Sequence, residues 1–180
     1  MILDTTFETE SGTVQLTDFM PVDAPGSPAL VRVVTGLEGV VELAWVLNLR
    51  FDYGSMPPWV TPTVDGIVGV VGPDCTALRT DAPFEPTADG AHGRVRVSAR
   101  EVRAFTLQYA ISHDALPPPV DTAAALERTV SYWHDWIGRY GRPSDWPAAV
   151  RRSLLTLKAL IHAPTGGLVA APTLGLPEEP

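Results

Sequence analysis

The sequence predicts a mostly β structure followed by C-terminal helices, and three observations carry this prediction. Up to about residue 111, runs of apolar and β-branched residues recur at spacings of about 8–12 residues, each followed by Gly, Pro or Asp turn signals. No helical period separates these runs, which disfavours a parallel α/β sheet. After Pro119, apolar residues recur with the period of a helix. We therefore expect an antiparallel β-sandwich over residues 1–116.

The strands are expected mainly as hairpins. The predicted strands are Leu3–Glu8, Val14–Phe19, Leu30–Thr35, Val40–Arg50, Ile67–Val71, Cys75–Arg79, Gly93–Ala99 and Val102–Ser112. The first hairpin should join Leu3–Glu8 to Val14–Phe19, and the last should join Gly93–Ala99 to Val102–Ser112. Between them, Leu30–Thr35 and Val40–Arg50 should form a hairpin with Gly36–Gly39 as its turn. Alternation is clearest in Val40–Arg50, where Leu43, Trp45, Leu47 and Leu49 share one face. The Pro- and Gly-containing stretch Phe84–Gly93 is expected to be a loop.

Two amphipathic helices are expected after the stiff linker Leu116–Pro119. The first covers Thr122–Arg139, with Asp121 as its N-cap. The second follows Ser144 or Asp145, with Pro147 in its first turn, and ends at the turn Ala163–Gly167. Its apolar stripe is widened by additional leucines, so we expect the second helix to be more buried than the first.

Charge and cysteine content narrow the possible classes of protein. The chain has 180 residues and a net charge of −8, and an acidic chain repels phosphate backbones, so no nucleic-acid partner is expected. Cys75 is the only cysteine, which excludes an internal disulfide and a cysteine-based zinc site and favours a reducing compartment. No apolar run approaches the roughly 20 residues of a membrane helix. The first residues are acidic, unlike a signal peptide, so we expect a cytoplasmic protein with no membrane partner.

Known catalytic signatures are missing from the sequence. The histidines at positions 92, 113, 134 and 162 do not have metal-ligand spacing, and there is no nucleophile elbow, phosphate-binding loop or dinucleotide fingerprint. We therefore expect no metal and no cofactor. Carboxylates are plentiful, but the sequence places no pair of them at the distance that carboxylate-pair hydrolysis requires.

One segment combines polar and aromatic side chains on a single strand-end loop. Arg50, Asp52 and Tyr53 lie within four residues of each other, and Trp59 follows shortly after. Such a set could stack on a sugar ring and hydrogen-bond its hydroxyl groups. Alternatively, the loop is only anchored by its own aromatic rings and an Arg–Asp pair. Both interpretations remain open at this point.

Several segments also match a known family in the right order. They are Leu3–Thr9, Leu16–Pro21, Arg50–Gly54, Ser153–Leu160 and Ala163–Thr173. Together they resemble glycoside hydrolase family 15, the bacterial glucoamylases and trehalases, and the stretch from Ser153 to Thr173 is the most specific. The resemblance covers essentially the whole chain. It departs at Leu174-Gly175, where the family usually has Thr-Ser, and in the late start, which would leave sandwich edges unpaired.

The resemblance implies a super-β-sandwich joined by a linker helix to an (α/α)6 barrel. Residues 1–116 would form the incomplete sandwich, 117–145 the linker and its helix, and 146–180 the first part of the barrel. The family cleaves terminal α-linked glucose, in trehalose, maltose or malto-oligosaccharides, with inversion by two glutamates. Both would belong to later segments, so the resemblance implies a fragment that has no catalytic residue and is inactive alone.

The expected substrate-binding residues are therefore few. They are Arg50, Asp52, Tyr53 and Trp59 from the residues themselves, and Pro172 and Thr173 from the loop that, by resemblance, approaches the sugar pocket. A rival interpretation is a stand-alone carbohydrate-binding sandwich with Tyr53 and Trp59 as its platform, and a third is a purely structural module. The sequence leaves open which α-glucoside is bound, whether the chain is an oligomer and whether a truncation is natural.

Overall fold

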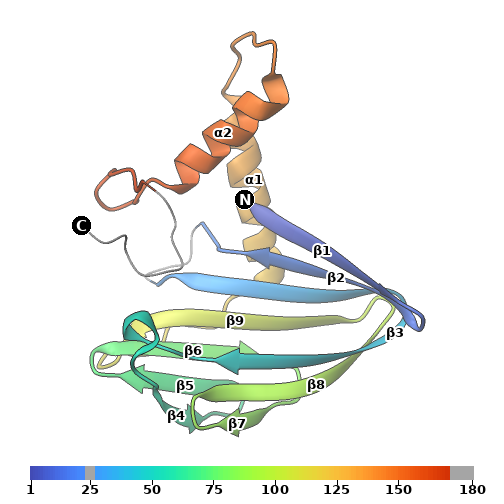
Figure 1. Cartoon of the computed structure of the whole chain (residues 1–180), viewed down its shortest axis with the longest axis vertical. Coiled ribbons are helices and arrows are strands. Elements are labelled where there is room, and N and C mark those ends of the chain that lie inside the picture. The colour runs from blue at the N-terminus through green and yellow to red at the C-terminus, as the bar shows by residue number, and fades with distance from the viewer. Residues whose placement is uncertain (23–26, 171–180) are drawn as a thin grey trace. The chain divides into compact units, whose positions relative to one another are not determined.

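The computed structural model of the chain describes residues 1–22 and 27–170. The chain divides into two compact units, which are described separately. One unit comprises Ile2–Arg128 and the other Thr129–Pro180 together with Met1. Figure 1 shows strands throughout the first unit and helix in the second.

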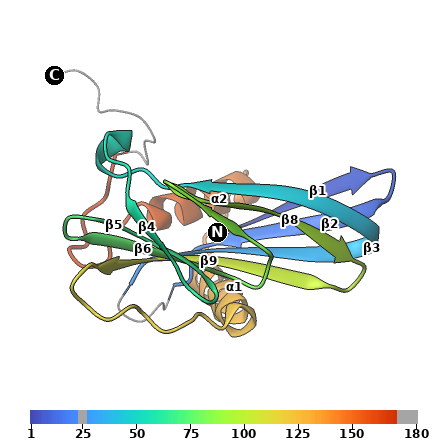
Figure 2. The same ribbon diagram turned by 90° about the horizontal axis from the view of Figure 1, so that it is seen from below.

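The first unit is an antiparallel sandwich of nine described strands. They are β1 (Ile2–Thr9), β2 (Gly12–Phe19), β3 (Ala29–Asn48), β4 (Trp59–Pro62), β5 (Gly66–Val71), β6 (Asp74–Thr80), β7 (Glu85–Thr87), β8 (Gly90–Ser98) and β9 (Val102–Ile111). The larger sheet has the order β1-β2-β3-β9-β6-β5-β4. The smaller sheet consists of β7, β8 and the second half of β3. Figure 2 shows the two sheets stacked as layers. The expected mostly antiparallel β structure is confirmed.

Strand β3 belongs to both sheets, and this corrects the predicted hairpin turn at Gly36–Gly39. Residues 29–39 pair with β2 and β9, whereas Val40–Asn48 pairs with β8. The glycines do not reverse the chain direction but allow the backbone of β3 to approach that of its neighbours. A Cβ at Gly36 would lie 1.9 Å from the Ser98 carbonyl oxygen, which leaves no room for a side chain. Gly39 has φ +62°, which favours glycine. The chain therefore bends from one sheet into the other without turning back.

The last predicted hairpin and the predicted loop Phe84–Gly93 are also wrong. β8 and β9 do not pair, because β8 joins β3 in the smaller sheet while β9 joins β3 and β6 in the larger one. Their connecting turn is bonded to the bend of β3, where the Arg100 amide donates to the Gly36 oxygen at 2.8 Å. The predicted loop contains β7 and the start of β8, since tertiary pairing overrides its Pro and Gly content.

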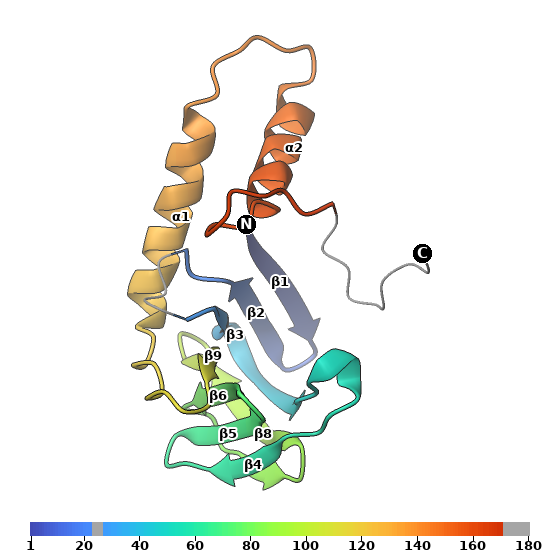
Figure 3. The ribbon, with the colours of Figure 1, turned by 90° about the vertical axis from the view of Figure 1, so that its left-hand side faces the viewer.

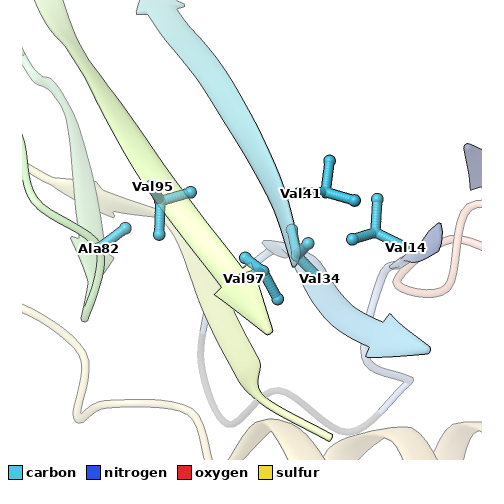
Figure 4. Packing of buried hydrophobic residues seen from close by; sticks show 6 residues of the cluster. All are labelled: Val14, Val34, Val41, Ala82, Val95 and Val97. Atoms are coloured by element: carbon cyan, nitrogen blue, oxygen red, sulfur yellow. The ribbon is translucent and has the colours of Figure 1, made fainter. Parts of the chain in front are cut away.

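The core lies between the two sheets. One cluster contains Val14, Val34, Val41, Ala82, Val95 and Val97. Figure 4 shows the valines of β3 and β8 pointing toward each other within it. A second cluster includes Leu49, Ile67, Leu78 and Ala91. Trp45 contacts both clusters and packs edge-on against Phe105, with ring centroids 5.1 Å apart. The predicted inward face of the second half of β3 is thus confirmed.

The outer face of the larger sheet holds the linker and the start of helix α1 (Thr122–Gly138). Phe19, Val31 and Ala125 form a third buried cluster there. The linker is bound by two side chains of the sheet: the Arg79 guanidinium donates to the Pro117 oxygen at 2.9 Å, and the Gln108 amide donates to the Pro118 oxygen at 3.1 Å. The linker is therefore docked on the sandwich.

The second unit contains the rest of α1 and helix α2 (Pro147–Ala159). The predicted N-cap of α1 is confirmed, since the Asp121 carboxylate accepts a bond from the Ala124 amide at 3.1 Å. The greater burial expected for α2 is wrong, because α2 has no buried residue. An apolar stripe is buried only where another element covers it, which the stripe itself does not ensure. Among the described residues, no helix is long and apolar enough to cross a membrane.

Substitution of Gly36 tests the bend of β3. Gly36→Ala places a methyl group 1.9 Å from the Ser98 oxygen, so the free energy of unfolding should fall by about 3 kcal/mol, as in severe overpacking. Urea denaturation followed by circular dichroism measures this change. Gly141→Ala is the matched control, because a Cβ there meets no atom within 4 Å. Equal stabilities of the two variants would contradict the close approach.

Candidate functional site

The predicted sugar-contacting segment forms a small closed loop at the end of β3 (Figure 3). The Phe51 amide donates to the Met56 oxygen at 2.9 Å, and the Met56 amide donates to the Phe51 oxygen at 3.1 Å. This bridge closes the loop around the short 3-10 turn η1 (Asp52–Gly54). The tip of the loop is thereby fixed by backbone bonds.

The loop tip has an unusual backbone conformation. Asp52 and Tyr53 have φ of 47° and 53°, in the left-handed region that residues with side chains rarely adopt. Ser55 stabilises it, since its hydroxyl donates to the Asp52 carboxylate at 3.0 Å and its amide to the Asp52 oxygen, also at 3.0 Å. Such strain is concentrated at functional sites in many proteins, so this tip is a candidate for ligand contact.

Apolar residues on either side anchor the loop to the core. Leu49 and Pro58 are buried, and Phe51 packs on the second core cluster. Gly69 on β5 leaves room for them, because a Cβ there would lie 2.7 Å from a Leu49 methyl carbon and 3.2 Å from Pro58 Cβ. The loop therefore projects from a packed base.

Arg50 pairs with a residue that the sequence did not suggest. Its Nη2 lies 2.6 Å from Asp89 Oδ2, and its Nη1 donates to the Leu49 oxygen at 2.8 Å. These bonds and the Thr87 hydroxyl hold the pKa of the Asp89 carboxyl below its usual value. Arg50 thus ties the end of β3 to the β7–β8 turn. No local pattern indicates Asp89, which lies 39 positions away and is brought close only by strand pairing.

Tyr53 and Trp59 are not used to anchor the loop. Their exposed fractions are 81% and 79%, and Met56 beside them is also exposed. Exposed aromatic rings on a rigid base can stack on the apolar faces of sugar rings, and the Asp52 carboxylate can accept bonds from hydroxyl groups. Of the two interpretations of this loop, self-anchoring by aromatic rings describes Phe51 but not Tyr53 or Trp59.

The remaining expectations concern residues outside this loop. Pro172 and Thr173 lie outside the described residues. Within the part of the chain that the structure describes, no group of three His, Cys, Asp or Glu side chains is arranged to hold a metal ion. Burial raises the pKa of the Cys75 thiol, which favours its protonated form.

Comparison with known proteins identifies trehalases as relatives. No family model matches the chain. It is 29% identical to a trehalase of Mycobacterium tuberculosis over 210 residues, covering 100% of this chain and 30% of that protein. It is 27% identical to a trehalase of Thermoplasma volcanium over 168 residues, covering 92% of this chain and 27% of that protein. The chain thus spans less than a third of the length of these relatives.

Similarity to solved structures is weaker. A kojibiose phosphorylase structure from the human microbiome aligns with a TM-score of 0.40 and 7% identity, over 86% of this chain and 23% of that one. A score this low does not establish a common fold.

Removal of the Asp89 charge tests the tie between β3 and the β7–β8 turn. A lowered folded-state pKa means that the ion pair stabilises the fold above the unfolded pKa of about 3.9 and is lost as pH falls through the folded value. As pH falls from about 5 to about 2, the free energy of unfolding should therefore decrease less in Asp89→Asn than in the parent. Urea titrations across this range measure it. Asp145→Asn, at an exposed position before α2, controls for charge removal and should follow the parent.

Proposed function

We propose that this chain supplies the β-sandwich part of a glycoside hydrolase that cleaves α-linked glucose, with trehalose as its substrate. The observation that carries the proposal is its similarity to trehalases over 92–100% of its length. The antiparallel sandwich, the docked linker and the helices after it agree with the architecture that the family resemblance implies. We further propose that the chain belongs to glycoside hydrolase family 15 and that α2 is the first helix of its catalytic barrel.

The catalytic acid and base of the proposed enzyme lie outside this chain. An inverting hydrolase needs a protonated general acid with a raised pKa and a second carboxylate roughly 6.5–9.5 Å away. The pKa of the Asp89 carboxyl is lowered by Arg50 and the Thr87 hydroxyl, the opposite of what a general acid needs. Because the family resemblance places both glutamates in later segments, we propose no catalytic role for the residues that the structure describes. A cytoplasmic location also stays a prediction from the sequence.

A chimera tests whether the chain is a functional part of such an enzyme. We expect no glucose release from trehalose by the 180-residue chain itself. A Mycobacterium tuberculosis trehalase whose aligned segment is replaced by this chain should release glucose, because the sandwich would support the same catalytic part. The same trehalase lacking that segment is the control. A well-folded chimera without activity, or an active isolated chain, would contradict the proposal.

A second candidate function is direct sugar binding by the loop at the end of β3. The observation that favours it is the exposure of Tyr53 and Trp59 on a rigid, strained loop. We propose that these rings stack on a glucose unit of trehalose or a malto-oligosaccharide. Arg50 is then a positioning residue that holds the base of the loop, while Asp52 accepts hydroxyl groups.

Titration of the isolated chain with trehalose and maltotriose tests this second function. Stacking contributes about 1 kcal/mol per ring, so Tyr53→Ala or Trp59→Ala should weaken binding about fivefold. Isothermal calorimetry measures the change. Trp146→Ala is the matched control, because Trp146 is similarly exposed at 75% but lies before α2. Unchanged binding in both loop variants, or none in the parent, would leave the loop without a sugar-binding role.

A further inference from the structure

The linker between the sandwich and α1 is a proline tract, and it offers the protein few ways of holding it. Pro117, Pro118 and Pro119 follow one another, and none of them carries a backbone N–H. The tract cannot join a sheet as a further strand, because it has acceptors but no donors. Its carbonyl oxygens can be held only by donors from other segments. Left free, a tract of this kind is a stiff spacer that can pivot at its two ends.

Arg79 on β6 supplies one of these donors, and all three nitrogens of its guanidinium are used. Nη2 donates to the Pro117 oxygen at 2.9 Å, Nη1 donates to Gln108 Oε1 at 2.6 Å, and Nε lies 3.4 Å from Asp65 Oδ2. The side chain is 17% exposed, so water competes little for these bonds. Because the guanidinium is planar and its donors form a fixed fork, three partners in different directions fix its orientation.

Gln108 on β9 supplies the second donor. Its Nε2 donates to the Pro118 oxygen at 3.1 Å, and the residue is only 3% exposed. Since Arg79 can only donate, the oxygen of the Gln108 amide faces Arg79 and the nitrogen faces the linker. The two side chains therefore hold two successive carbonyl oxygens and also orient each other. We call Arg79 and Gln108 the linker clamp.

An apolar contact follows the linker clamp along the chain. Through the directly opposed residues of β6, β9, β3 and β2, Val31 and Phe19 lie on the same face of the larger sheet as Arg79. Both form one buried cluster with Ala125 of α1, which is 1% exposed. Val120, between the proline tract and the helix, packs on the same cluster. The chain is thus held by polar contacts at one point and by apolar contacts at the next.

Helix α1 begins directly after these contacts. The Asp121 carboxylate caps its first turn at the Ala124 amide, so the linker passes straight into the helix. The unit that contains the sandwich extends to Arg128, inside α1. α1 has 17 residues, so its axis runs for about 25 Å in a direction that its first turns determine.

We propose that the linker clamp makes this connection a rigid joint, in which Arg79 and Gln108 are positioning residues that fix the direction of α1 relative to the sandwich. The two carbonyl contacts stop the proline tract from pivoting at its start, and the packing of Val120 stops it from pivoting at its end. All these contacts lie within Ile2–Arg128, so the joint needs no other chain. If the proposed function holds, the same joint determines where the chain after α1 can lie.

The alternative is that the apolar cluster alone holds α1, and that the linker clamp only stabilises the sheet. Loss of a single linker contact separates the two explanations. Gln108→Glu keeps the size of the side chain and the acceptor for Arg79. It replaces the donor to Pro118 by a carboxylate oxygen, which repels the Pro118 oxygen. The variant therefore releases one carbonyl and leaves the apolar cluster in place.

Distances between spin labels in the whole chain test the proposal. Labels on Val64→Cys, in the turn before β5, and on Glu127→Cys, at an exposed position of α1, report the direction of the helix in a Cys75→Ala background. Double electron–electron resonance should give one narrow distance distribution in this parent. Gln108→Glu should broaden it about twofold, because one of the two bound carbonyls is released. Gln15→Glu, the same change on β2, is the matched control and should keep the parent's width.

A second variant and a folding check complete the test. Arg79→Met removes the bond to Pro117 and the support of Gln108, so it should broaden the distribution further than Gln108→Glu. Circular dichroism checks that each variant is folded, so that added width reports the joint and not unfolding. A broad distribution in the parent, or the parent's width in folded Gln108→Glu, would overturn the proposal. None of these outcomes depends on trehalose hydrolysis, so failure of the joint and failure of the proposed function are distinguishable.

Discussion

The close approach of Gly36 to the Ser98 oxygen determines the arrangement of the sandwich. It lets one 20-residue strand, β3, pair with β2 and β9 in its first half and with β8 in its second. Because the β8–β9 turn is bonded to the same point, β8 and β9 are directed into different sheets. The core valines on β3 and β8 face each other as a result. A side chain at position 36 would separate these backbones and remove the bend on which both sheets depend.

The candidate site is a consequence of where β3 ends. Leu49, Phe51 and Pro58 bury the base of the following loop, and the Arg50–Asp89 pair holds it against the smaller sheet. These contacts support the strained conformation at Asp52 and Tyr53, since local strain persists only where surrounding contacts impose it. The aromatic rings that remain exposed are thus displayed on a rigid support, as a contact surface requires.

The two sheets of the sandwich differ in size. Seven strands in the larger sheet face three in the smaller one, so apolar residues of β1, β2 and β3 remain exposed on an inner face.

The sequence by itself determined the local elements. Alternation identified the inward face of Trp45 and its neighbours, turn residues located the β1–β2 hairpin, and Asp121 marked the start of α1. It also singled out Tyr53 and Trp59 as a possible contact surface. These features depend on neighbours within a few residues, which local patterns record.

Only the tertiary structure decided which strands pair and which residues hold the site. The glycines at 36 and 39 read locally as a turn, yet their close contacts with Ser98 and Ser11 make them a bend between sheets. The partner of Arg50 is distant in sequence, and the burial of α2 depends on what covers it. Such features arise from contacts between segments far apart along the chain, and a periodic pattern carries no information about which segments will meet.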